Sequence, residues 1–160
     1  MSPLPQTARI AASAAAEELL ARILYAEAGT RPVRAIEGLA SLSINRAQAV
    51  LASHEACIRF AGGVAAASLP RALIAVLRAP FQFPVRHAAH PRHAQFAQPI
   101  EGDPALAVCR RIAGRAMSGA LRDMTGGALH WHGEGRQPAW ALARVPSADF
   151  GGLSFYRFDV

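Results

Sequence analysis

Residues 14–29 read AAAEELLARILYAEAG, and this stretch predicts the helix around which the rest of the chain is organised. Leu19, Leu20, Ile23 and Leu24 recur at helical spacing, which gives the segment one apolar face. Glu17 and Glu18 suit the first turn of a helix. Gly29 is a good stop residue, so the helix is expected to end beside it. Residues 1–14 are interpreted as a loose leader.

Further helices are expected on both sides of the middle of the chain. Pro32 fits an early position of a second helix over about 33–51, in which Gly38 predicts close approach by another backbone. Pro70 opens a short helix over 70–78. Asp103-Pro104 is an N-cap followed by proline, and begins a helix that runs to about 118–121. Residues 85–103 are expected to be a loop, and 54–69 fit no clear pattern.

The C-terminal part has strand patterns instead. Strands are expected over 128–132, over 140–145 and over 153–158, with a turn at Gly151-Gly152. Helices first and a small antiparallel sheet last predict an α+β domain. With 160 residues, of which 52% are hydrophobic, the chain is expected to form a single domain over 15–160.

The charge balance is strongly basic. All 17 positive residues are arginines, and with 11 acids the formal net charge is +6. Such a surface attracts polyanions, including the anionic bacterial wall. The arginines form no dense run and no known nucleic-acid motif, so a nucleic-acid partner is not expected. No export signal is visible, and no apolar run is long enough to span a membrane.

Two cysteines, Cys57 and Cys109, both sit among apolar residues. This is too few for a disulfide scaffold, and two buried free thiols are expected.

Three segments have the residue types of a functional site. Glu27 lies beside the apolar face of its helix and close to the helix C-terminus, and both features would raise the pKa of its carboxyl, as a general acid requires. Gln82 lies between Phe81 and Phe83, and an amide between aromatic rings suits a sugar. Thr125-Gly126-Gly127 lets a backbone come close to a ligand. Each segment could also be structural: a helix end, core aromatics and a hairpin entry.

In this order, the segments resemble the cell wall hydrolase family that includes the spore cortex-lytic enzymes. The resemblance covers about residues 19–157. It rests on Tyr25-Ala26-Glu27-Ala28, Ile44-Asn45-Arg46, Gln82-Phe83, Asp123-Met124-Thr125-Gly126-Gly127-Ala128 with His130-Trp131-His132, Pro138-Ala139-Trp140, and Gly151-Gly152 with Phe155-Tyr156. Gly29-Thr30-Arg31 stands where the family commonly has Arg-Gly-Glu, so the second acid is missing, Met124 replaces a proline, and Leu153 replaces a histidine.

The resemblance implies a lysozyme-like α+β domain that cleaves peptidoglycan between N-acetylmuramic acid and N-acetylglucosamine, with Glu27 as the catalytic residue and no cofactor. Its expected site is the bacterial wall, by an export route that the sequence does not show, and the short chain favours a monomer. Acetamido sugars would be held by Gln82, Thr125, Gly126 and Gly127. Apolar walls would come from Phe83, Trp131, Trp140 and Tyr156, about half of which are expected to be core residues instead.

Hydrolytic glycosidases generally use two carboxylates. The motif around Glu27 has one, which favours a lytic transglycosylase. Glu37, Asp123 and Asp149 could still supply a second acid, and Asp123 is favoured because it borders the Thr-Gly-Gly turn.

Two other classes of function stay open. His87, His90, His93, His130 and His132 could bind zinc in an amidase that cuts the peptide stem. However, the first three lie in a proline-bearing loop, and the last two have no partner acid at a ligand spacing. The chain could also be a non-catalytic wall-binding module, in which Glu27 would be dispensable.

Overall fold

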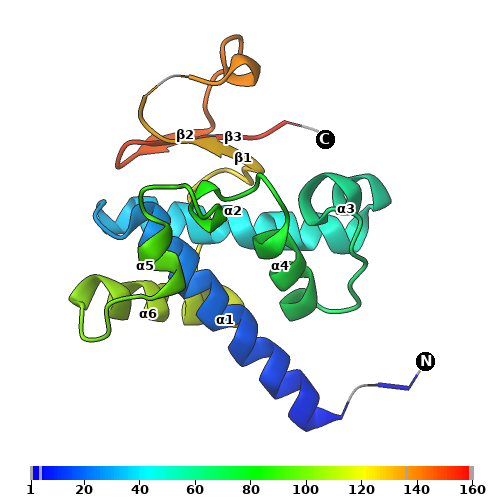
Figure 1. The fold of residues 1–160 in the computed structure, drawn as a ribbon. Coiled ribbons are helices and arrows are strands. Elements are labelled where there is room, and N and C mark those ends of the chain that lie inside the picture. Colours follow the sequence, from blue (N-terminus) through cyan, green and yellow to red (C-terminus); the bar gives the residue numbers. More distant parts are fainter. Residues whose placement is uncertain (1, 4, 136, 159–160) are drawn as a thin grey trace.

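The computed structural model describes residues 2–3, 5–135 and 137–158 and shows helices followed by a small sheet (Figure 1). The main helices are α1 (Gln6–Ala28), α2 (Val33–Ala52), α4 (Leu69–Arg78) and α6 (Pro104–Ser118); the shorter ones are α3 (His54–Ala61) and α5 (His93–Ala97). Strands β1 (His130–His132), β2 (Ala148–Phe150) and β3 (Leu153–Tyr156) follow, with 3-10 turns η1 (Pro84–Arg86) and η2 (Ala139–Ala141). The expected α+β class is confirmed.

Helix α1 runs obliquely through the helical part of the molecule and packs against α6, α4 and α5 (Figure 1). Its apolar face is fully buried at Leu20, Ile23 and Leu24, as the spacing predicted. The helix begins at Gln6, so the expected loose leader over 1–14 is corrected. The reason is local: residues 11–16 are nearly all alanine, the best helix former, and they extend the helix outward with little burial.

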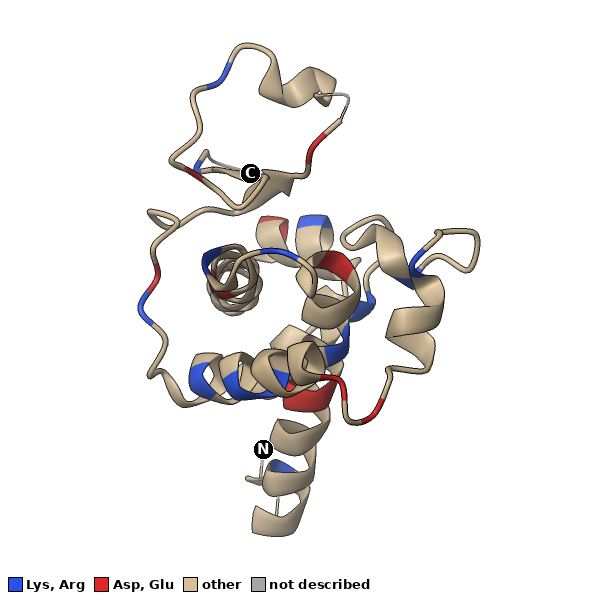
Figure 2. Cartoon of the chain, turned by 90° about the vertical axis from the view of Figure 1, so that its left-hand side faces the viewer, with Lys and Arg blue, Asp and Glu red and all other residues tan. Residues whose placement is uncertain are grey.

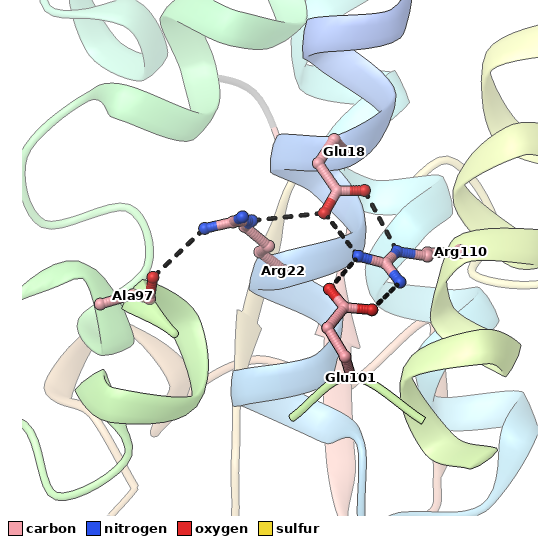
Figure 3. A network of polar contacts seen from close by, with 5 residues as sticks. All are labelled: Glu18, Arg22, Ala97, Glu101 and Arg110. Atoms are coloured by element: carbon pink, nitrogen blue, oxygen red, sulfur yellow. Dashed lines mark hydrogen bonds and ion pairs between the residues drawn. The ribbon is translucent and has the colours of Figure 1, made fainter. Parts of the chain in front are cut away.

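A four-residue ionic network ties α1 to α6 (Figure 3). Arg110 on α6 donates to Glu18 at 2.9 Å and to Glu101 at 2.8 Å. Arg22, one turn after Glu18, donates to the same carboxylate at 3.3 Å and to the carbonyl of Ala97. The network therefore joins the first half of the chain to the loop that precedes α6.

The sheet is antiparallel in the order β1-β3-β2 and lies over α2. Trp131 pairs with Phe155 across β1 and β3, and Asp149 pairs with Ser154 across β2 and β3. The contact with α2 is made at Gly38, where an added Cβ would lie 2.6 Å from the Phe150 ring and 2.7 Å from the Phe155 ring. The expected close approach at Gly38 is thus made by aromatic rings, not by another backbone.

Two expectations about local structure are wrong, and one segment left open by the sequence is helical. Residues 140–145 form a 3-10 turn and loop, not a strand, and the missing strand is β2, two residues after Pro146. The unassigned 54–69 segment contains α3, which Ser53 caps by accepting a hydrogen bond from Ala56 N. The expected loop over 85–103 contains α5 and part of η1.

Both cysteines are buried free thiols, as expected. Within the described residues, no helix is both long enough and apolar enough to cross a membrane.

Candidate functional site

Glu27 lies in the last turn of α1, and two residues from other segments form hydrogen bonds with this turn. Arg92 donates to the carbonyl of Ala26 at 2.6 Å and to that of Tyr25 at 3.4 Å. The Tyr25 hydroxyl donates to Asp103 at 2.6 Å, and Asp103 also caps α6. These contacts tie the end of α1 to the loop before α6 and to Arg92, which satisfies the Ala26 carbonyl near the helix end.

One carboxylate oxygen of Glu27 has a fixed partner. The Val85 N–H donates to its Oε1 at 3.1 Å, and the Val85 carbonyl is itself held by His93 Nδ1 at 2.8 Å. His93 therefore positions Val85, and Val85 positions the glutamate. No other hydrogen bond to the Glu27 carboxylate is formed within the described part of the chain.

Burial raises the pKa of Glu27 from its ordinary 4.5 to about 7. The hydrogen bond from Val85 and the charges of Arg92 and Arg31 act in the opposite direction and limit the rise. The helix-end position supports the same direction, since a carboxylate is disfavoured there. A carboxyl poised near neutrality can both give and take a proton.

A cavity of about 880 Å³ lies between α3, residues 81–84 and β1 with the loop that follows it. Three of its lining residues are buried, namely Arg46, Phe60 and His130, and we call them the cavity floor. Both tryptophans of the chain, Trp131 and Trp140, line its wall, and so does Gln82. The cavity thus combines aromatic faces with polar groups, as binding sites commonly do.

Neither Glu27 nor the residues that act on it belong to the lining, but residues next to them do. Val85 directly follows Pro84, which lines the cavity. Arg31 lies against Gly133 and pairs with Glu134 at 3.5 Å, and these two residues also line it. Glu27 is partly exposed and is connected to this wall through Val85 and Arg31.

Of the four aromatic residues expected to bind sugar, two line the cavity and two are core residues, which agrees with the expectation that about half are core. Trp131 and Trp140 line the cavity, whereas Phe83 and Tyr156 are each only 2% exposed and belong to the core. The Tyr156 hydroxyl hydrogen-bonds to His132 Nε2 at 2.8 Å. Gln82 lines the cavity while its amide nitrogen donates to the carbonyl of Arg59, which leaves its oxygen for a ligand.

The Thr125-Gly126-Gly127 segment is not brought to the cavity. Thr125 is fully buried, and its N–H and hydroxyl both donate to Asp123 Oδ1. Asp123 Oδ2 accepts from Gly127 N and from Asn45 Nδ2, each at 3.0 Å. The segment is a closed turn that joins α2 to the sheet, so the expectation that it binds sugar is corrected.

The three acids considered as a second carboxylate also lie outside the cavity lining. Three of the four hydrogen bonds to Asp123 come from its own turn and the fourth comes from Asn45 on α2, and Glu37 pairs with Arg115 at 3.2 Å. Asp149 is exposed on β2. The acids that do line the cavity are Glu55 and Glu134, which the sequence patterns did not single out.

The five histidines considered for zinc do not converge. Within the described residues, no group of three or more His, Cys, Asp or Glu is placed to hold a metal ion. The His87 and His90 rings each accept from a backbone N–H two residues later, and His130 stacks on Phe158 with ring centres 3.7 Å apart.

Sequence reasoning also missed the residues that support Glu27. Val85, Arg92 and His93 come from a segment about sixty residues away, which the pattern assigned to a loop. Arg46 was noted only for its place in the Asn45-Arg46 pair, and no local signal marks it as buried.

The chain was compared with protein-family models, with curated proteins and with solved structures, and no match was found in any of the three.

Proposed function

We propose that this chain cleaves peptidoglycan glycan strands between N-acetylmuramic acid and N-acetylglucosamine, as a lytic transglycosylase with a lysozyme-like catalytic domain. The observation that carries the proposal is a single glutamic acid with a pKa of about 7, whose partner Val85 follows Pro84 in the lining of a cavity walled by both tryptophans of the chain. The motif resemblance around Glu27 supplies the substrate class. The site of action would be the bacterial wall.

In the first step, Glu27 donates its proton to the glycosidic oxygen as that bond breaks. The N-acetylglucosamine side leaves with this proton as a hydroxyl group. Burial keeps Glu27 protonated near neutral pH, which this step requires.

In the second step, the Glu27 carboxylate takes the proton of the muramic 6-hydroxyl. The freed oxygen bonds to the anomeric carbon and closes a 1,6-anhydro ring, so no water is consumed. The Val85 N–H and the charges of Arg92 and Arg31 stabilise the carboxylate between the two steps.

Hydrolysis is the second candidate, because one observation favours it. Glu134 lines the cavity and pairs with Arg31, whose charge acts on Glu27, so a second carboxylate of the cavity is linked to the acid through Arg31. In a hydrolase Glu134 would activate water or attack the sugar.

The test is digestion of purified peptidoglycan by wild type, Glu27→Gln, Glu134→Gln and Glu17→Gln. Glu17 lies on the same helix as Glu27 but outside the cavity, and serves as the matched control. Transglycosylation predicts loss of at least about 100-fold in Glu27→Gln and activity near that of wild type in the other two. A loss of the same size in Glu134→Gln would indicate hydrolysis, and full activity in Glu27→Gln would refute the proposal.

A further inference from the structure

The cavity floor contains an arginine without a counter-charge. Arg46 comes from α2, is only 5% exposed, and lies over the rings of Phe60 and Phe83 at 5.1 and 5.7 Å. Its Nε donates to the carbonyl of Leu129 at 2.7 Å. The aromatic rings and this one hydrogen bond hold the guanidinium in place.

One end of the guanidinium is buried without a hydrogen-bond partner in the described chain. Within the described chain, Nη1 of Arg46 has no hydrogen-bond partner, and Arg46 forms no ion pair with any carboxylate. Burial lowers the pKa of Arg46 to about 9, which leaves the group charged at neutral pH. A buried charge without a partner strongly favours uptake of an anion.

His130 presents a second unpaired nitrogen on the same floor. The residue is 7% exposed, and its Nε2 also lacks a partner within the described residues. Its ring is 5.7 Å from Phe60, the ring that Arg46 also covers. Burial and the charges of Arg46, Arg59 and Arg144 lower the pKa of His130 to about 4, against a hydrogen bond with the Phe158 backbone that raises it, so the ring is neutral. A neutral ring has a single N–H, which we assign to Nε2.

Arg59 adds positive charge at the rim. It is exposed, lines the same cavity, and lies close enough to Arg46 to affect its pKa. The acids of the lining, Glu55 and Glu134, are exposed, and neither pairs with the floor. The deep end of the cavity is therefore positive.

We propose that the cavity floor binds a carboxylate of the substrate, with Arg46 and His130 as its hydrogen-bond donors and Arg59 as a steering charge. An arginine and a neutral imidazole N–H are matched to the two oxygens of a carboxylate. The inference rests on the proposed function for its substrate: the carboxylate is either the lactyl group of muramic acid or a carboxylate of the peptide stem.

The experiment is a titration followed by tryptophan fluorescence, because Trp131 and Trp140 are the only two tryptophans and both line the cavity. Three probes are used: N-acetylmuramic acid with its free lactyl carboxylate, muramyl dipeptide with a stem carboxylate only, and N-acetylglucosamine with none. At least one carboxylate probe is expected to bind about tenfold or more tightly than N-acetylglucosamine. The carboxylate probe that binds more tightly shows whether the cavity floor takes the lactyl carboxylate or the stem carboxylate.

Two variants test the floor directly. Arg46→Met keeps much of the side-chain volume, and His130→Phe keeps the stacking on Phe158. Each is expected to remove the preference for carboxylate probes by about tenfold, while Arg71→Met and His87→Phe, exposed residues outside this cavity, should not. His130→Phe still tests the proposal if Arg46→Met fails to fold.

Equal affinity for all three probes, no binding of either carboxylate probe, or an unchanged preference in His130→Phe would each overturn the inference. The proposed function can fail separately. If the protein binds the carboxylate probes but does not cleave peptidoglycan, the proposed glycosidase activity is refuted and the carboxylate site is retained.

Discussion

The Glu27 carboxyl is placed where ionisation is unfavourable, and this has a consequence for stability as well as for chemistry. Its pKa is about 7 in the folded chain against an ordinary 4.5. The folded state therefore holds a proton that the unfolded chain has released between these two values. The free energy of unfolding must fall as pH rises through this window and then stay low.

Replacement by the neutral isostere should show this. Glu27→Gln is expected to be as stable as wild type near pH 4, and more stable by up to roughly 3 kcal/mol near pH 8. Urea unfolding at both pH values measures the difference, with Glu17→Gln as control. Equal stability of Glu27→Gln and wild type at both values would mean that the carboxyl is well solvated.

The same pKa sets the pH dependence of activity. As general acid, Glu27 must be protonated in the free enzyme, so kcat/KM is expected to fall above about pH 7 by about tenfold per unit. A pH profile on soluble peptidoglycan fragments measures this limb. A profile that stays flat up to about pH 9 would exclude Glu27 as the acid.

At the residue scale, the sequence could identify Glu27 but not its surroundings. Its position on the apolar face and at the helix end indicated a raised pKa in advance. Val85 and Arg92 could not be found because they reach Glu27 only through the tertiary fold. Thr125 and its glycines were misread, since two glycines after a threonine serve a closed turn as well as a ligand site.

At the scale of elements, the position of the sheet depends on a glycine in α2. A side chain at Gly38 would overlap the rings of Phe150 and Phe155, which are the sheet's contact with the helices. Helices α2, α4 and α6 were predictable because proline positions and apolar spacing are local signals, whereas the short helices α3 and α5 were missed. Strand β2 is three residues long and is defined by pairing with β3, so no local pattern marks it.

Gly38→Ala is therefore expected to destabilise the fold by about 1–3 kcal/mol, although alanine is the better helix former. The matched control is Gly114→Ala on α6, where the added Cβ would meet only the flexible end of Glu17 at 3.1 Å. Thermal unfolding of both variants gives the comparison. A stabilised Gly38→Ala would show that the sheet does not pack on α2 as described.

A second prediction at the scale of elements concerns the turn that Asp123 closes. Burial opposes ionisation of Asp123, but hydrogen bonds from Thr125, Asn45 and Gly127 outweigh it and lower the pKa. Asp123→Asn should cost about 1–3 kcal/mol at neutral pH, because the amide cannot accept all of these bonds. The loss should shrink below about pH 3.8, where wild type also becomes protonated. Asp149→Asn, exposed on β2, is the control, and a deficit that is unchanged at low pH would contradict the account.

At the scale of the molecule, charge is spread over the helices and not concentrated in one element (Figure 2). The net charge of +6 favours association with an anionic wall by a long-range and weakly directional attraction. Binding of the Glu27→Gln variant to purified walls should fall several-fold between about 0.05 M and 0.5 M salt. Co-sedimentation measures it, and binding that does not depend on salt would indicate that contacts in the cavity dominate.

The central claim is that one carboxyl does both proton transfers. Digestion of peptidoglycan in heavy-oxygen water, with mass spectrometry of the products, tests it most directly. The account predicts 1,6-anhydro-muramic ends that carry no heavy oxygen, formed by wild type and not by Glu27→Gln. Reducing muramic ends that carry heavy oxygen would contradict it and would assign the second carboxylate to hydrolysis.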